Sequence, residues 1–137
     1  MMVTITSTYT GGLHCEAVHG PSGAKLQTDA PCDNHGKGET FSPTDLFATS
    51  LGVCYLTTMG ICAESHDVNM KGSTATVDKH MSDDRPRRIS RLDIKIDFCE
   101  GIPFKYRGLL EAVAINCPVS KSLNPDIELN YSFNFPD

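Results

Sequence analysis

The stretch "SPTDLFATSLGVCYLTTMGICAESH" (residues 42–66) predicts one long helix with a defined beginning. Ser42 is a good N-cap and Pro43 suits the first helical position. Asp45 is placed to reach back to the cap and to meet the positive end of the helix. Apolar residues then recur at steps of three and four, which predicts a buried stripe that includes a cysteine. The members of this expected stripe are Phe47, Leu51, Cys54, Thr58 and Ile61.

Two glycines interrupt this helix. Gly52 and Gly60 each weaken a helix by about 1 kcal/mol relative to alanine. Their presence predicts that another element lies against that surface, and a close helix crossing is the simplest arrangement. We therefore expect the helix to be packed at both glycines.

Short β-rich segments flank the helix on both sides. Before it, strands are expected near residues 3–9, 13–19 and 24–28, followed by a polar, glycine-rich loop at 32–40. After it, strands are expected near 67–80 and 87–99, then a helix over about 104–116 and a last alternating strand in "DIELNYSFNF" (126–135). The order of elements predicts an α+β fold in a single domain over residues 1–137.

A second cysteine lies in "NCPVSKSL" (116–123). It continues the apolar stripe of the second helix, and Pro118 suits the first position of a further short helix, which would make Cys117 its N-cap. A thiol at a helix N-terminus is expected to have a lowered pKa, whereas a mid-helix thiol such as Cys54 is expected to have a raised one. From position alone, inert packing accounts better than chemistry for either cysteine, because free cysteine behaves as a small hydrophobe.

Composition narrows the function classes. The 137 residues are 39% hydrophobic and 21% charged with a net charge of −5, and the basic residues are few apart from "RPRR" at 85–88. This balance argues against a nucleic-acid surface. The N-terminus lacks a basic head with an apolar run, and no stretch is expected to be long enough to span a bilayer, so we expect a cytoplasmic protein without a membrane partner.

Cysteine content points to chemistry rather than to a disulfide framework. Six cysteines are too sparse for a stapled scaffold, and a reducing cytosol would keep most of them as thiols. Any cysteine chemistry is then expected to be catalytic or related to a metal. The six are Cys15, Cys32, Cys54, Cys62, Cys99 and Cys117.

Two segments together, "SPTDLFATSLGVC" (42–54) and "NCPVSKSL" (116–123), resemble the osmotically inducible protein C and organic hydroperoxide resistance (OsmC/Ohr) family, over about residues 8–131. The resemblance implies antiparallel sheets wrapped around two main helices in an intertwined homodimer. It also implies reduction of organic hydroperoxides in oxidative-stress defence, with Cys54 as the attacking thiol and Cys117 as the resolving thiol. An external dithiol, for example one of the lipoyl type, would restore the pair, and no metal or organic cofactor is needed.

The chain departs from the peroxidases of that family at two positions. Leu13 stands where they carry an arginine, and Thr44 stands at the place of the glutamate that pairs with it, so the chain is nearer to the OsmC-like branch that lacks the arginine. His14, Thr44 and Asp45 are candidate supporting residues. Lys37, His35 or His14 from the partner subunit could supply the missing positive charge to Cys54.

A metal site is a second hypothesis. Cys62 and His66 are four residues apart on one helix face, and Cys32 and His35 form a C-x2-H pair in the loop. Together they could hold one zinc ion, although no C-x2-C pair is present. For Cys15 the alternatives are pairing with Cys32 or simple packing.

A non-catalytic role is a third hypothesis. Phe47, Leu51 and Tyr55 could line a pocket for an inert apolar molecule or lipid tail as well as for a fatty hydroperoxide. Loss of peroxide consumption in serine variants of Cys54 and Cys117 would separate the enzyme from the binding protein.

Overall fold

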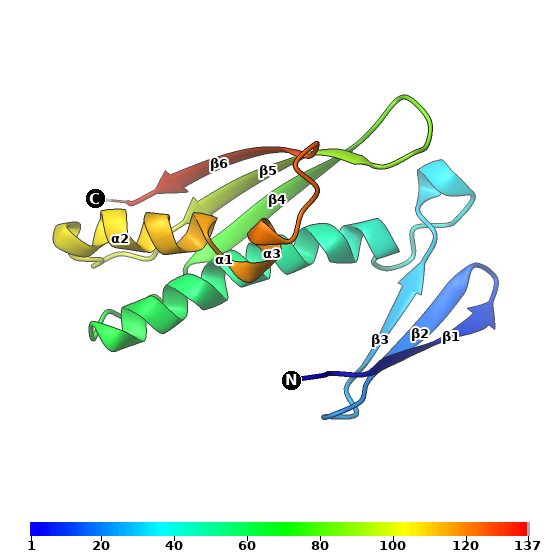
Figure 1. Ribbon diagram of the computed structural model, residues 1–137, viewed down its shortest axis with the longest axis horizontal. Coiled ribbons are helices and arrows are strands. Elements are labelled where there is room, and N and C mark those ends of the chain that lie inside the picture. Colours follow the sequence, from blue (N-terminus) through cyan, green and yellow to red (C-terminus); the bar gives the residue numbers. More distant parts are fainter. Residues whose placement is uncertain (137) are drawn as a thin grey trace. The chain divides into compact units, whose positions relative to one another are not determined.

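The computed structural model describes residues 1–136 and divides into two compact units, Met1–Phe47 and the remainder from Ala48 onward (Figure 1). The long helix α1 (Pro43–Ser65) begins in the first unit and continues into the second. Each unit has its own three-stranded sheet. The α+β class expected from the sequence is confirmed.

The first unit is an antiparallel sheet followed by a loop. Its strands β1 (Ile5–Gly11), β2 (His14–His19) and β3 (Lys25–Asp29) are neighbours in chain order, and a single 3-10 turn, η1 (Cys32–Asn34), follows. The β1–β2 turn needs a left-handed backbone at Gly11, Gly12 and Leu13, with φ of 96°, 60° and 64°. The three strands expected near 3–9, 13–19 and 24–28 are all present.

Helix α1 begins as its sequence predicts. The Ser42 N–H donates to Asp45 Oδ2 at 2.9 Å, and the Asp45 N–H donates to Ser42 Oγ at 3.1 Å. This reciprocal pair satisfies two backbone donors that would otherwise lack partners at a helix N-terminus.

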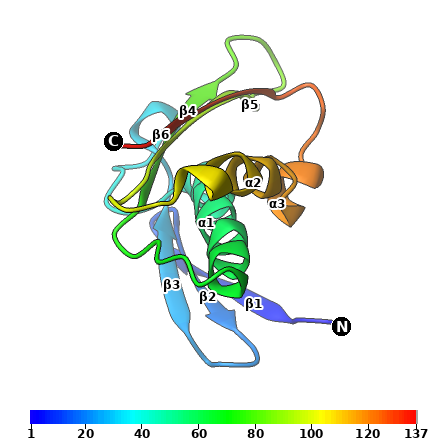
Figure 2. The same ribbon diagram turned by 90° about the vertical axis from the view of Figure 1, so that its left-hand side faces the viewer.

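The second unit is a sheet with helices on one face (Figure 2). It contains β4 (Thr74–Met81), β5 (Ile89–Asp97), α2 (Phe104–Ile115), α3 (Pro118–Lys121) and β6 (Glu128–Asn134). β4 and β5 are antiparallel, but β5 and β6 are parallel, so this sheet is mixed rather than wholly antiparallel. The reason is the connection, since α2 and α3 carry the chain across the sheet before β6 begins. Residues 67–73, expected as strand, form turns and irregular chain instead.

The core of this unit lies between the sheet and α1. On β5, Leu92, Ile94 and Ile96 are buried and alternate with polar residues, as predicted. On α1 the expected stripe is wrong at two positions, because Phe47 and Ile61 are exposed, while Cys54 and Thr58 are half-buried. The helix is apolar on nearly all sides, so periodicity alone does not reveal its inner face. The buried positions of α1 are Ala48, Leu51, Gly52, Tyr55, Met59 and Ala63.

The two glycines of α1 have different surroundings. A Cβ built on Gly52 would lie 2.9 Å from Val77 Cγ2 and 3.5 Å from Ala75 Cβ, so strand β4 packs closely there. The expected close approach is therefore confirmed at Gly52, but the neighbour is a strand and not a helix. At Gly60 the expectation is wrong, since no atom lies within 4 Å of such a Cβ.

Helix α1 also corrects the expectation about membrane-spanning length. With 23 residues and a mean hydropathy of 1.6 over its most apolar window, it is long and apolar enough to cross a bilayer by length and composition alone. Tyr55 and Met59 on this helix are nevertheless fully buried inside the second unit. A core helix whose outer side is also apolar meets the same criteria of length and apolar composition.

Candidate functional site

The second unit brings Cys54 and Cys117 into contact. Cys54 lies half-buried on α1, and Cys117 is fully buried immediately before α3. A hydrogen bond between the two side chains is one of the causes that raise the pKa of Cys117. Two thiols that are far apart in the sequence are therefore neighbours in a shielded position.

Cys117 is the N-cap of α3, as expected, with Pro118 at the first helical position. Its Sγ accepts a hydrogen bond from the Ser120 N–H at 3.3 Å. The expected lowering of its pKa is wrong, because burial raises the pKa of this thiol by more than the N–H groups of Ser120 and Val119 lower it. The helix has only four residues, so few aligned peptide dipoles oppose the cost of desolvation.

Tyr55 places a phenol beside the two thiols. Burial, followed by the proximity of Cys117, raises the pKa of Tyr55 to about 12, although the Ser120 side chain acts in the opposite direction. The hydroxyl has no hydrogen-bond partner among the described residues that meets normal geometry. At neutral pH this group is protonated and, among the described residues, has no hydrogen-bond partner, while both thiols contribute to its raised pKa. In the sequence, the one indication of this group is that the residue directly after Cys54 in the apolar helix is a tyrosine, whose ring ends in a hydroxyl.

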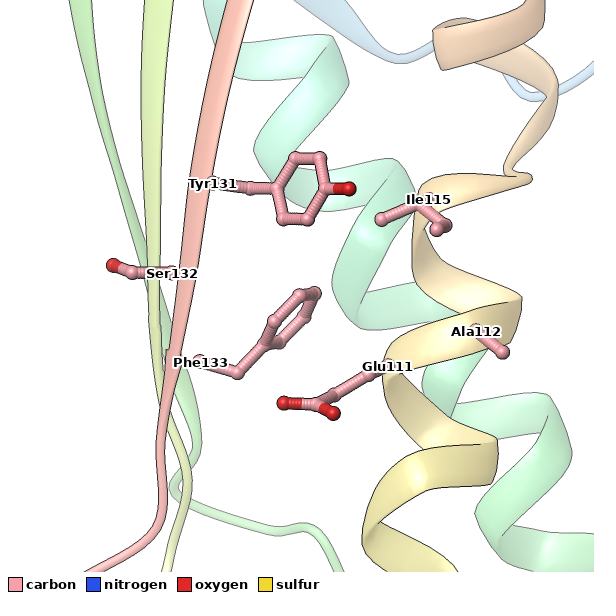
Figure 3. A pocket seen from close by; sticks show the side chains of 6 residues that line it. All are labelled: Glu111, Ala112, Ile115, Tyr131, Ser132 and Phe133. Atoms are coloured by element: carbon pink, nitrogen blue, oxygen red, sulfur yellow. The ribbon is translucent and has the colours of Figure 1, made fainter.

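A cavity of about 290 Å³ lies between α2 and β6 (Figure 3). Its wall connects to the thiols through aromatic rings, since Phe133 stacks on Tyr55 with ring centres 6.5 Å apart and Tyr131 contributes to the raised pKa of Tyr55. Figure 3 shows the Glu111 carboxylate directed toward Phe133. The cavity is therefore mainly apolar with one acidic group. Its lining residues are Glu111, Ala112, Ile115, Tyr131, Ser132 and Phe133.

The supporting candidates lie in the first unit, whereas Cys54 and Cys117 lie in the second. Thr44 Oγ1 is 3.2 Å from Ser42 Oγ, and Asp45 caps the helix. His14 begins β2 and faces Asp29, with 3.5 Å between Nε2 and Oδ1. A role for any of them in activating Cys54 stays a prediction, as does activation by Lys37 or His35.

The four residues of the zinc hypothesis fall into two pairs, one in each unit. Cys62 Sγ lies 4.0 Å from His66 Nδ1, but that nitrogen is also 2.9 Å from the Cys62 carbonyl oxygen. The Cys32 thiol donates to the Lys37 carbonyl at 3.2 Å. Among residues 1–136, no group of three or more neighbouring ligand atoms includes any of these residues. The zinc site stays a prediction.

The other cysteines show local contacts. All six cysteines are free thiols, so Cys15 and Cys32 are not paired in this structure. The Cys99 thiol donates to the Asn69 carbonyl at 3.4 Å, which fits a structural role.

A protein-family comparison matches residues 36–132 to the family described as OsmC-like protein. A protein from Psychrobacter arcticus 273-4, assigned to an osmotic stress induced and detoxification response, is 43% identical to this chain. The alignment covers 98% of this chain and 97% of that one, with a TM-score of 0.91.

More distant structures share the fold alone. The organic hydroperoxide resistance protein OsmC of Legionella pneumophila is 16% identical, with a TM-score of 0.75 over 98% of this chain and 97% of that one. The organic hydroperoxide resistance protein OhrB of Bacillus subtilis is 14% identical, with a TM-score of 0.70 over 98% of each chain. No curated protein sequence matches the chain.

Proposed function

From the premise that this chain belongs to the OsmC-like protein family, we propose that it reduces organic hydroperoxides through the thiols of Cys54 and Cys117. The OsmC/Ohr family is linked to osmotic stress and to hydroperoxide resistance. The observation that carries the proposal is the contact between the half-buried thiol of Cys54 and the buried thiol of Cys117. A half-buried cysteine that touches a second cysteine can be oxidised and then resolved without unfolding.

The proposed reaction has three balanced steps. The Cys54 thiolate attacks the hydroperoxide ROOH, the O–O bond breaks, and the alcohol ROH leaves after taking a proton, with sulfenic acid left on Cys54. The Cys117 sulfur then displaces hydroxide from this sulfenic acid, a disulfide forms, and one water is released. An external dithiol finally reduces the disulfide by exchange and becomes oxidised itself.

The two thiols suit different roles. Burial raises the pKa of Cys117, so this group stays a thiol at neutral pH, which suits a residue that acts only after the sulfenic acid has formed. Cys54 is only half-buried, which suits a thiol that a substrate must reach. Its Sγ lies 3.9 Å from Thr58 Oγ1, a hydroxyl that can donate to a thiolate.

Tyr55 offers a donor to the reacting oxygen. Its hydroxyl is buried, protonated and without a partner among the described residues, and it adjoins both thiols. A hydroperoxide bound at Cys54 would place polar oxygen atoms in this otherwise apolar space. A hydrogen bond from Tyr55 to the leaving oxygen would be strengthened as negative charge develops there.

The cavity between α2 and β6 gives room for the organic part of the substrate. With about 290 Å³ and walls of Ile115, Tyr131 and Phe133, it can take an alkyl or aryl group, and Phe133 of this wall stacks on Tyr55, the neighbour of Cys54 in the chain. We propose a homodimer as the active form, a lipoyl-type dithiol as reductant and a reducing, cytoplasmic location.

Binding of an apolar molecule without turnover is the alternative function. The same cavity favours it, because its apolar walls do not require redox chemistry. The two functions differ in what the cysteines do, so substitution of the thiols separates them.

The test is a peroxidase assay with cumene hydroperoxide and dihydrolipoamide. We expect the wild-type protein to consume peroxide, and Cys54→Ser and Cys117→Ser each to abolish turnover. Cys62→Ser, on the same helix and also half-buried, is the matched control and should retain full activity. Equal consumption in wild type and in both variants would contradict the enzyme, and retention of cumene hydroperoxide by the protein without its consumption would support the binding function.

A further inference from the structure

A cluster of three potential ligands lies in the first unit, whereas Cys54 and Cys117 belong to the second. His14 Nε2 is 3.5 Å from Asp29 Oδ1 and 3.9 Å from Glu39 Oε1. The three ligand atoms lie within 4.8 Å of one another. This is the one such group of three among residues 1–136.

The backbone fixes this arrangement. β2 and β3 pair so that the Cα atoms of His14 and Asp29 are direct partners across the sheet. The loop after β3 then folds back, and the Glu39 N–H donates to Asp29 Oδ2 at 3.0 Å. Gly36 permits this fold, because a Cβ there would lie 1.7 Å from the Ala30 carbonyl oxygen. The cluster is therefore built by ordered main chain.

The second nitrogen of His14 determines which atom faces the carboxylates. Nδ1 lies 2.8 Å from the Gly12 carbonyl oxygen, which can only accept a hydrogen bond. Nδ1 must then carry the proton, and in the neutral ring Nε2 presents a lone pair to Asp29 and Glu39. Metal-binding histidines have this arrangement, with the non-ligating N–H donated to a carbonyl or carboxylate.

Asp29 supplies an independent observation. Its side chain is 1% exposed, and Oδ1 has no hydrogen-bond partner among the described residues. The N–H of Glu39 is the main cause that lowers the pKa of this carboxyl, which keeps it ionised. A buried anionic oxygen that faces a nitrogen lone pair without a donor between them is unfavourable. The separations of 3.5 and 3.9 Å exceed the 2.7–2.9 Å of charge-assisted hydrogen bonds.

We infer that His14, Asp29 and Glu39 form a binding site for a divalent transition-metal ion. Two ligands held at about 2.1 Å from one ion at a tetrahedral angle lie about 3.4 Å apart, close to the His14–Asp29 separation. One imidazole and two carboxylates suit Mn²⁺, Fe²⁺ or Zn²⁺ better than Ca²⁺ or Mg²⁺. The side chains of His14 and Glu39 are 33% and 54% exposed, which leaves a path for the ion and room for water ligands.

The test is a titration of the full-length, chelator-treated protein with Mn²⁺, followed by the electron paramagnetic resonance signal of the free ion. Mn²⁺ is the probe because the six thiols would compete for Zn²⁺. We expect one ion per chain, and binding at least about tenfold weaker in His14→Gln and in Glu39→Gln. His19→Gln and Glu16→Gln, which alter the same strand, are the matched controls and should bind as the wild type does.

A second readout is thermal unfolding with and without Mn²⁺. The ion should raise the melting temperature of the wild type but not that of Glu39→Gln, whose side chain is 54% exposed. The double variant Cys54→Ser/Cys117→Ser should still bind Mn²⁺, so the site stands apart from peroxide chemistry. Absence of binding at millimolar Mn²⁺, or binding in His14→Gln and Glu39→Gln that equals that of the wild type, would contradict the metal site.

Discussion

The hydroxyl of Tyr55 and the thiol of Cys117 both end in the core of the second unit, where water cannot solvate a charge. At each group the largest effect on the pKa is desolvation, and at each the pKa is raised. The Ser120 side chain at Tyr55 and the Ser120 N–H at Cys117 act in the opposite direction, but their effects are smaller. The prediction of an acidic Cys117 considered only the helix N-terminus, and burial, which depends on tertiary packing, decides the sign.

Replacing Tyr55 with phenylalanine should stabilise the protein and reduce its activity. The variant removes a buried hydroxyl without a partner, which we expect to raise the free energy of unfolding by about 1 kcal/mol at neutral pH. The difference in the free energy of unfolding between the variant and the wild type should grow as the pH rises from 10 toward 12. The reason is that the Tyr55 phenol ionises near pH 10 in the unfolded chain, whereas burial raises its pKa to about 12 in the folded protein. Urea unfolding of both proteins across this pH range measures the difference. Cys117 is present in both proteins, so its own titration is common to the two measurements.

In the peroxidase assay the same variant should lose about tenfold in kcat/KM, the loss expected for one hydrogen bond to a developing charge. A purely structural Tyr55 would leave turnover unchanged while stability rose. Full activity in Tyr55→Phe would therefore remove this residue from the mechanism.

Helix α1 shows what could be predicted at the scale of one element. Its beginning at Ser42, its length and its cap with Asp45 follow from local chemistry and are confirmed. The face that it buries could not be predicted, because apolar residues occur on nearly every side. The pairing of β5 with β6 was equally hidden, since a parallel neighbour depends on the path of α2 and α3.

Alanine at the two glycines of α1 should have opposite effects. At Gly52 the added methyl would lie 2.9 Å from Val77 Cγ2, so crowding against β4 should exceed the gain in helix propensity and destabilise by about 1 kcal/mol. At Gly60 the space is open, so the gain in propensity should stabilise by up to about 1 kcal/mol. Denaturant unfolding of the pair provides the comparison, and equal shifts of the same sign would contradict the packing described for β4.

At the scale of the whole molecule, several large apolar side chains of the second unit remain exposed. Val53 and Ile61 on α1 are 55% and 67% exposed, and Phe104 on α2 is 84% exposed. Apolar surface of this kind is typical of a protein that associates. It supports the proposed homodimer, in which the outer side of α1 meets a second copy.

Sedimentation equilibrium should therefore give twice the 14.9 kDa chain mass. Ile61→Glu, which places a charge on this exposed surface, should shift the equilibrium toward the monomer, while Glu64→Gln on the same helix should not. A wild-type protein that sediments as one chain at micromolar concentration would be inconsistent with the dimer.

The central claim is that Cys54 and Cys117 act as one redox pair. It is tested most directly by treating the fully reduced protein with one equivalent of cumene hydroperoxide and mapping its cysteines by mass spectrometry. The account predicts a Cys54–Cys117 disulfide in the wild type, and a sulfenic acid on Cys54 in Cys117→Ser. Oxidation elsewhere among the six cysteines, with Cys54 and Cys117 still reduced, would contradict it.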